Sequence, residues 1–226
     1  MATILISPLI MGSTTKLYPS DDAYTDSSSK NSNFDNSNIR VGYDWNHGKH
    51  RGYFKFNLSN LEEVSSAKLV LYRVASIGNP LIELHYVSSD SWDENSLTWN
   101  NAPLNESEII DSKVISSGNP IEFEITPLMN EQDNILSIAL VADKEFTSNP
   151  EGYYALFYSS NMGDEIYFPY IEIISEAECN TDADVNCNGC VEMGELLNFI
   201  SEWKLGNAQM SELLNGISMW KSGGGC

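Results

Sequence analysis

The sequence predicts a mainly β protein, in which a jelly-roll β-sandwich is followed by a small α-helical module. Three observations support this prediction. Short apolar segments separated by turn residues fill the chain from Lys16 to about Ile174, which is typical of a two-sheet sandwich. The apolar period then changes from that of strands to that of helices. All four cysteines lie in the last 48 residues, where a small module needs covalent support.

The composition limits the size and the partners of the protein. The chain has 226 residues, of which 42% are hydrophobic, so one sandwich-sized domain can bury a core and the remainder is too small to fold unaided. Lys and Arg total 12 against 32 Asp and Glu, giving a net charge of −20. Nucleic acid is not expected as a partner, because phosphate binding needs a concentrated basic surface. An acidic surface favours solubility and divalent cations instead.

Eight segments before residue 175 have the features of strands. In one of them, Ile121, Phe123 and Ile125 face one way and the intervening glutamates face the other, which is the period of a half-buried strand. Residues 20–38, rich in Ser, Asn and Asp, are expected to form a surface loop, with a polar rim that binds a ligand or ion as the alternative. The predicted strands are 39–43, 51–57, 67–75, 81–87, 121–126, 135–142, 153–158 and 166–174.

Two similar segments near the C-terminus predict a pair of antiparallel helices. Residues 193–204 and 210–221 repeat with a spacing of 17 residues, and each places its apolar side chains on one helical face. Gly206 and Gly223 stand where a left-handed residue ends a helix. The predicted apolar faces are Met193, Leu196, Leu197, Ile200 and Trp203 in the first helix and Met210, Leu213, Leu214, Ile217 and Trp220 in the second.

The segment 184–195 has the spacing of an EF-hand calcium loop at every fixed position. Calcium takes about six to eight oxygen ligands, so alternate residues of a tight loop present Asp or Asn oxygens. Gly189 permits the sharp turn, and Glu195 at the start of the next helix closes the shell with both oxygens. The alternative is an acidic loop without metal. The predicted calcium ligands are Asp184, Asn186, Asn188, the carbonyl of Cys190, Glu192 directly or through water, and Glu195.

The cysteines predict two disulfides and an oxidising, extracellular location. Four cysteines allow three pairings, and the sequence leaves the choice among Cys179, Cys187, Cys190 and Cys226 open. The spacing of Cys187 and Cys190 is also that of zinc ligands, but no second Cys or His pair accompanies it.

The apolar segment 1–14 has two interpretations. It is too short to span a bilayer and resembles the core of a signal peptide, although no Lys or Arg precedes it and no clear cleavage site follows. Alternatively, it is retained as a strand that pairs with an exposed sheet edge of a neighbouring copy. Repeated strand donation of this kind would build a head-to-tail filament.

The segment from Cys179 to Cys226 resembles a dockerin-like module of archaeal and bacterial extracellular proteins. The resemblance rests on the calcium loop, the helix that follows it and a second copy of that helix. No Asp or Asn stands at ligand spacing before Met210, so one calcium is implied rather than two. No apolar helix precedes the loop, and we expect the calcium to lock the module rather than to act as a sensor. The predicted module covers residues 176–226.

Residues 22–174 resemble a DNRLRE-domain protein. The resemblance rests on 22–26, 38–42 and 51–59, and above all on 91–103, whose sequence SWDENSLTWNNAP is very close to the family pattern W-x-E-x-x-[VL]-T-W-N-x-x-P. It implies a jelly-roll fold related to carbohydrate-binding modules, often attached to polysaccharide-active enzymes or cell-surface proteins. The predicted domain covers residues 15–175.

Trp92 and Trp99 of this motif are interpreted as core or loop anchors, because buried aromatics dominate sandwich cores. Glu94 and Asn100 are expected to fasten the loop through backbone hydrogen bonds. A cluster of basic and aromatic residues is the better candidate for holding acidic sugars by charge-assisted hydrogen bonds and ring stacking. The alternative is that these cations balance neighbouring acids. The candidate ligand contacts are Arg40, Tyr43, Trp45, Lys49, His50, Arg51 and Lys55.

Three functions remain open. The one we favour is a non-catalytic, calcium-binding surface protein, secreted by an archaeon or bacterium, which self-associates or binds an extracellular scaffold in assembly or adhesion. The alternative is a carbohydrate-binding module for an acidic extracellular polysaccharide. The third is a polysaccharide lyase, for which His50 or Tyr53 with Arg51 are the candidates, or a hydrolase that uses a pair of the many carboxylates. A catalytic site is not expected, because the three histidines stand in no recognisable motif.

Overall fold

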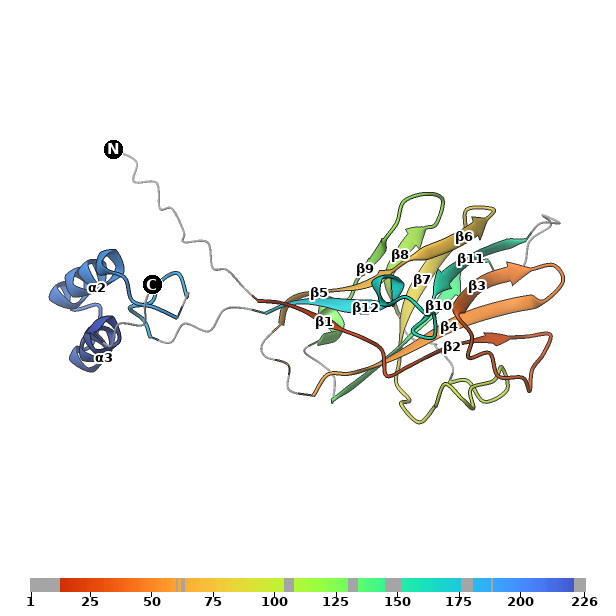
Figure 1. Cartoon of the computed structure of the whole chain (residues 1–226), viewed down its shortest axis with the longest axis horizontal. Helices are drawn as coiled ribbons and strands as arrows, with labels where there is room; N and C mark the ends of the chain where they lie inside the picture. The colour runs from red at the N-terminus through yellow and green to blue at the C-terminus, as the bar shows by residue number, and fades with distance from the viewer. Residues whose placement is uncertain are drawn as a thin grey trace. The chain divides into compact units, whose positions relative to one another are not determined.

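The chain consists of two compact units, one formed by Thr14–Ile174 and the other containing Ser13 and the described residues from Ser175 onward. The first is a two-sheet β-sandwich and the second carries two helices (Figure 1), which confirms the predicted fold class. None of the helices in the described ranges has the length and apolar content that a membrane span requires. The computed structural model describes residues 13–59, 61, 64–103, 108–129, 134–144, 152–175, 181–187 and 189–221.

The sandwich has an eight-stranded sheet of order β6-β11-β3-β4-β10-β7-β8, in which β2 also pairs with β4, and a four-stranded sheet of order β1-β12-β5-β9. The strands of the larger sheet are β2 (Asp21–Asp26), β3 (Asn38–Asp44), β4 (Gly48–Asn57), β6 (Arg73–Ile77), β7 (Leu81–Val87), β8 (Ile109–Val114), β10 (Ile135–Ala142) and β11 (Tyr153–Tyr158). Those of the smaller sheet are β1 (Thr14–Leu17), β5 (Val64–Leu71), β9 (Ile121–Glu124) and β12 (Tyr170–Ser175). Two single turns complete the sandwich, α1 (Thr126–Met129) and the 3-10 turn η1 (Glu165–Tyr167).

The main core lies between the two sheets, and β4 is central to it. Phe54 of β4 belongs to the same buried cluster as Leu69 of β5 and Phe123 of β9. Tyr53, the residue before Phe54 in β4, points to the other face of the sheet and is buried in a second cluster with Trp92. β4 is therefore buried on both faces. Its inner face packs against the smaller sheet, and residues outside the two sheets, such as Trp92, cover its outer face.

Most of the predicted strands are confirmed. The predicted bounds 81–87, 135–142 and 153–158 coincide with β7, β10 and β11. The single strand predicted over 67–75 is wrong, because the chain breaks at Tyr72 into β5 of the smaller sheet and β6 of the larger one.

The surface loop predicted over residues 20–38 is wrong in its first part, where β2 pairs with β4 along its whole length. β2 buries Asp22 and Asp26 as well as Ala23. Its sequence, DDAYTD, has polar residues at buried positions, so it lacks the apolar alternation by which a strand is recognised. β8 is also absent from the predicted strands, and none of its residues is buried.

His50 of β4 is buried beside Tyr24, with the two ring centroids 5.7 Å apart. Neither ring nitrogen has a hydrogen-bond partner among the described residues. Burial is the main cause that lowers the pKa of His50 to about 4, and the carboxylate of Asp26 opposes this shift. The ring is therefore neutral in the folded chain at pH 7.

We predict that His50→Phe reduces the loss of stability on acidification. The folded pKa of His50 lies below its ordinary value of 6.5, so the stability that comes from the neutral ring is present above that value and is lost as the pH falls toward 4. Between pH 7 and pH 5 this loss amounts to roughly 2 kcal/mol of unfolding free energy. Urea unfolding of both proteins at the two pH values measures it.

Only the difference between the two proteins reports on His50, because Asp22 titrates in the same range. Burial is the main cause that raises the pKa of Asp22 to about 7, so protonation of this carboxyl stabilises the fold as the pH falls. An equal pH dependence in the wild type and His50→Phe would contradict the prediction.

The helices of the second unit are α2 (Met193–Leu205) and α3 (Met210–Lys221). α2 ends at Gly206, whose φ of 83° and ψ of 13° confirm the predicted left-handed cap. Gly223, the second predicted cap, lies outside the described residues. Both helices share a small core with Ala183 and Val191 of the preceding loop.

The predicted apolar faces of the helices are partly wrong. Leu196 and Phe199 of α2 are buried, whereas Met193 and Leu197 are exposed, and α3 likewise exposes Leu214. The helices bury the side that meets the preceding loop. A helical period defines an apolar stripe but not the direction from which another segment covers it.

Gly216 of α3 lies so close to this loop that a Cβ atom on it would stand 2.7 Å from the Cβ atom of Ala183. Within a helix, glycine normally costs about 1 kcal/mol relative to alanine. We predict the opposite sign here, with Gly216→Ala destabilising the second unit by about 1–3 kcal/mol through overpacking.

The matched control is Gly194→Ala in α2, where no described neighbour lies within 4 Å of the added Cβ. This change should leave stability unchanged or raise it. Thermal unfolding followed by the helical circular dichroism signal measures both variants. A Gly216→Ala protein as stable as the control would show that the contact with Ala183 relaxes freely.

Candidate functional site

The segment 88–103, which we call the Trp92 loop, covers the outer face of the larger sheet. Trp92 is 7% exposed and packs edge-to-face on Tyr53 of β4, with ring centroids 6.0 Å apart. Its indole N–H donates to the hydroxyl of Ser137 in β10 at 3.2 Å. Leu97 lies in the same buried cluster. The interpretation of Trp92 as an anchor is confirmed.

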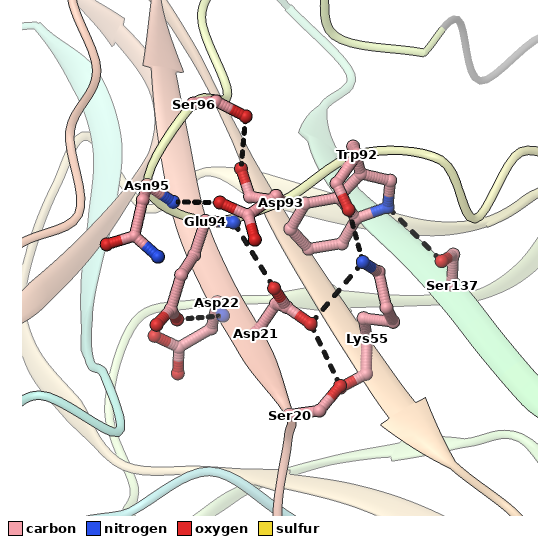
Figure 2. A network of polar contacts seen from close by, with 10 residues as sticks. All are labelled: Ser20, Asp21, Asp22, Lys55, Trp92, Asp93, Glu94, Asn95, Ser96 and Ser137. Atoms are coloured by element: carbon pink, nitrogen blue, oxygen red, sulfur yellow. Dashed lines mark hydrogen bonds and ion pairs between the residues drawn. The ribbon is translucent and has the colours of Figure 1, made fainter.

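A buried lysine holds this loop to the sheet (Figure 2). The Nζ atom of Lys55 lies 3.3 Å from Oδ2 of Asp21, donates to the carbonyl oxygen of Trp92 and stands 4.6 Å from the centroid of the Trp92 ring. The other oxygen of Asp21 accepts from the backbone N–H of Glu94 at 3.3 Å. We call these four residues the Lys55 clamp. Lys55 is only 9% exposed, so it has no surface for a sugar, contrary to its place among the candidate contacts.

Glu94 ties the loop to β2. One oxygen of its carboxylate accepts from the backbone N–H of Asp22 at 3.1 Å, which confirms that it fastens the loop through a backbone hydrogen bond. The Asn33 amide donates to the carbonyl oxygen of Glu94. Asn100 fastens the loop in two ways, because its side-chain amide donates to Oδ1 of Asn31 at 2.8 Å and its backbone N–H donates to the carbonyl oxygen of Lys30 at 3.1 Å.

A recess of about 300 Å³, which we call the Arg40 recess, is formed by β2, β3, β11 and the residues just before β3. Nη1 of Arg40 donates to Oδ2 of Asp44 at 3.0 Å. The carbon of the guanidinium lies 5.2 Å from the ring centroid of Tyr154. The residues that line the recess are Tyr24, Asn36, Ser37, Asn38, Arg40 and Leu156.

The groups in the Arg40 recess suit a sugar. The amides of Asn36 and Asn38 can both donate to and accept from sugar hydroxyls. The guanidinium of Arg40 can bind a carboxylate through two parallel hydrogen bonds. Tyr24 supplies an aromatic ring, and its pKa is raised, chiefly by burial, so its hydroxyl is neutral at pH 7.

A second recess, of about 430 Å³, is lined by residues of the Trp92 loop. Its described lining contains no basic side chain, and Asp93 adds an acid. The serine hydroxyls there suit a neutral polar ligand better than a carboxylate. The lining residues are Ser88, Ser89, Ser91, Trp92, Asp93, Ser96, Leu97, Asn101 and Pro103.

Arg51 of β4 stacks on Trp99, with the guanidinium carbon 4.8 Å from the ring centroid. Both side chains are half-buried. The backbone N–H of Asn100 donates to the carbonyl oxygen of Lys30 at 3.1 Å, which holds this end of the Trp92 loop in place. Trp99 is thus a loop residue at the surface, whereas Trp92 belongs to the buried core.

The other candidate sugar contacts lie on the β3–β4 hairpin and differ in exposure. Trp45 is 55% exposed at the turn between β3 and β4. Tyr43 and Lys49 are half-buried and face each other across that hairpin. His50 is buried and has no surface for a ligand.

The two residues suggested for a lyase, His50 and Tyr53, are both buried. The hydroxyl of Tyr53 donates to the carbonyl oxygen of Pro103 at 3.2 Å. Neither residue presents its acid–base group to a substrate.

Tyr24, Asn36 and Asn38 of the Arg40 recess were not among the predicted contacts. The run of amide and hydroxyl residues before β3 was the available signal, since the polar rim was the alternative interpretation of residues 20–38. Leu156 of β11 gave no signal, because only the pairing of β11 with β3 brings it next to Arg40.

Two acidic side chains of the 184–195 segment accept hydrogen bonds from backbone N–H groups of the same segment. Asp184 is fully buried, and its Oδ2 atom accepts from the backbone N–H of Gly189 at 3.0 Å. Glu195 spans the loop, with Oε1 accepting from the N–H of Asn186 at 3.1 Å and Oε2 from that of Glu192 at 3.0 Å. Gly189 has a φ of 82°, as the predicted sharp turn requires. These hard oxygen donors on one loop are of the kind that calcium prefers.

Two further features of this segment concern its cysteines and Asn188. Cys187 and Cys190 are disulfide-bonded, which leaves neither sulfur as a thiolate for zinc. Cys179, Cys226 and the predicted ligand Asn188 lie outside the described residues. The disulfide pairing and the calcium therefore stay predictions.

Comparisons with known proteins match the sandwich to a family and find a related enzyme. Residues 13–167 match the family described as Carbohydrate-binding module family 96. A gellan lyase from a Bacillus species is 28% identical over 154 residues, which cover 63% of this chain and 6% of that enzyme. The chain thus spans only a small part of that relative's length. The predicted relation to carbohydrate-binding modules is confirmed, whereas the DNRLRE and dockerin resemblances stay predictions. Through its sandwich, the chain belongs to carbohydrate-binding module family 96.

Proposed function

We propose that the protein is an extracellular, non-catalytic module that binds an acidic polysaccharide in the Arg40 recess. The observation that carries the proposal is a guanidinium in a recess that also holds amide, hydroxyl and aromatic groups. Membership of a carbohydrate-binding family supports it. The family favours this function over assembly or adhesion, which the sequence had placed first. Residues 1–12, on which the filament hypothesis depends, lie outside the described residues.

The charge of the chain explains why a local cation matters. At a net charge of −20, the protein repels a polyanion from a distance. Binding then depends on a cation that meets the carboxylate directly, by a charge-assisted hydrogen bond. Arg40 suits this role, because Asp44 orients its guanidinium and the planar fork matches a carboxylate better than an ammonium group does.

Gellan is the first polymer to test, because a gellan lyase is 28% identical to this chain over 154 residues. The alignment covers only 6% of that enzyme, so we do not propose lyase activity for this chain. The burial of His50 and Tyr53 supports a binding role rather than a catalytic one.

We predict that Arg40→Gln weakens binding to gellan and to polygalacturonate about tenfold or more. Glutamine can still donate to Asp44, but the charge and the bidentate hydrogen bonds to a sugar carboxylate are lost, which costs roughly 1.5–3 kcal/mol. Affinity electrophoresis in gels containing each polymer, with starch as a neutral reference, measures the change.

The matched control is Arg73→Gln, which removes the same charge from β6, where Arg73 contacts Gly118 and Ser76 rather than the recess. Its retardation should equal that of the wild type. Unchanged binding by Arg40→Gln would refute the proposed site. A loss confined to Arg51→Gln would transfer the site to the Arg51–Trp99 stack, and no retardation by either acidic polymer would refute the ligand class.

We also propose that the second unit binds one calcium ion through its 184–195 loop. The support is the arrangement of Glu195, which contacts the backbone at two points of the loop, and of the buried Asp184. When bound, calcium would supply a strong positive charge that draws these oxygens together and locks the loop onto α2. The proposed ligands remain Asp184, Asn186, Asn188, the carbonyl of Cys190, Glu192 and Glu195.

We predict that a chelator makes the chain cleavable by trypsin after Lys204, an exposed residue at the end of α2, while the sandwich stays folded. Loss of the ion leaves acidic oxygens close together, and their repulsion loosens the loop on which α2 packs. Glu195→Gln should reproduce this cleavage without chelator, whereas Glu202→Gln on the same helix should not. Mass spectrometry of timed digests locates the cuts. Equal resistance at Lys204 with and without chelator is the contrary result.

A further inference from the structure

Three carboxylates meet on the sandwich, outside the Arg40 recess. Asp22 comes from β2, Asp35 follows the bridge between Tyr24 and Phe34, and Glu94 comes from the Trp92 loop. One oxygen from each lies within 4.8 Å of the others. The tertiary structure thus gathers three acids from three separate segments.

A second observation distinguishes this cluster from an ordinary acidic surface. The side chain of Asp22 has no exposed area. Its Oδ2 atom accepts from the backbone N–H of Ser160 at 2.8 Å, but its Oδ1 atom has no hydrogen-bond partner among the described residues. Figure 2 shows the carboxyl group of Asp22 directed at that of Glu94. A buried acceptor left without a partner is costly, so this arrangement calls for a bound group.

The described residues supply no cation to this cluster. The nearby ammonium group of Lys55 is paired with Asp21, and no cation is among the main causes that shift the pKa of Asp22, Asp35 or Glu94. Burial is the main cause that raises the pKa of all three carboxyls, with neighbouring acids adding to it. Either a proton or an external cation must therefore reduce the repulsion.

We propose that Asp22, Asp35 and Glu94 form a calcium-binding site within the sandwich. Three carboxylates of this spacing present hard oxygen donors around one point, and calcium accepts water or carbonyl oxygens for the rest of its shell. Magnesium is less suited, because it demands a near-ideal octahedron and gives up its water reluctantly. The site is separate from the loop in the second unit.

The position of the ligands indicates what the ion does. Asp35 immediately precedes Asn36 and Ser37, which line the Arg40 recess. Glu94 lies next to Asp93, which lines the recess of the Trp92 loop. A calcium ion on these ligands would hold β2, the residues before β3 and the Trp92 loop in one arrangement, and so would fix a rim of each recess.

The test uses the full chain with the loop of the second unit disabled by Glu195→Gln. After removal of metal, this protein is titrated with calcium chloride by calorimetry, and thermal unfolding of the sandwich is followed with and without calcium. We expect about one calcium per chain, against about two for the wild type, and a higher melting temperature of the sandwich in calcium.

Variants of the cluster identify the ligands. In the Glu195→Gln background, Asp35→Asn should weaken calcium binding about tenfold or more, and Asp22→Asn should abolish it. Asp90→Asn, which removes an exposed carboxylate from the Trp92 loop, should leave it unchanged. Asp22→Asn should also raise the melting temperature in chelator, because it removes a buried charge and keeps an acceptor for the N–H of Ser160.

The contrary outcomes are equally defined. No heat of binding and no calcium-dependent melting shift in the Glu195→Gln chain would mean that Asp22 shares a proton with its neighbours, and would overturn the site. Calcium binding that survives both Asp22→Asn and Asp35→Asn would place the ion elsewhere. A wild type that binds one calcium, retained in Glu195→Gln and lost in Asp35→Asn, would support this site and remove the one proposed in the second unit.

Discussion

The Lys55 clamp is the interaction on which the functional side of this sandwich depends. A buried ammonium group is tolerated only if it is paired and hydrogen-bonded. Lys55 meets both conditions, with Asp21 as its counter-ion and the carbonyl and ring of Trp92 as its other partners. Through these contacts the Trp92 loop covers the outer face of β4 and buries Tyr53. Together with the hydrogen bonds of Glu94 to Asp22 and Asn33, they position the acid cluster and the recess of the loop.

Charge pairing within the chain explains why acidic residues are proposed to bind a cation, whereas most of the basic residues are not proposed to contact a ligand. Several cations are engaged by acids within the chain, among them Lys55 by Asp21, Arg40 by Asp44 and Lys68 by Glu122. The alternative interpretation of the basic cluster, that its members balance neighbouring acids, holds for Lys55. Arg40 differs, because its pairing with Asp44 positions it in a recess that also carries amides. The cluster of Asp22, Asp35 and Glu94, of which Asp22 is buried and the other two are half-buried, is where an external cation can meet acids.

The proposed binding sites are distributed over both units. The sandwich carries the family relationship, both recesses and the acid cluster, whereas the helical unit carries the EF-hand-like loop. Calcium has a similar physical role in both proposals, which is to hold loops that apolar burial alone does not fix. For the sandwich this means rims around a ligand, and for the helical unit a small core built on Leu196, Phe199 and Leu213.

The sequence by itself determined the fold class, most of the strands, both helices and the identity of the Trp92 motif. Those features depend on periods and spacings within short segments, where local chemistry decides the structure. Only the tertiary structure decided that β2 is a strand, that Lys55 and His50 are buried, and that Asp22, Asp35 and Glu94 meet. Alternation along a strand shows that a side chain points to one face of a sheet. Whether a distant segment then covers that face depends on contacts between residues far apart in the chain, such as Lys55 with Trp92, which no local pattern records.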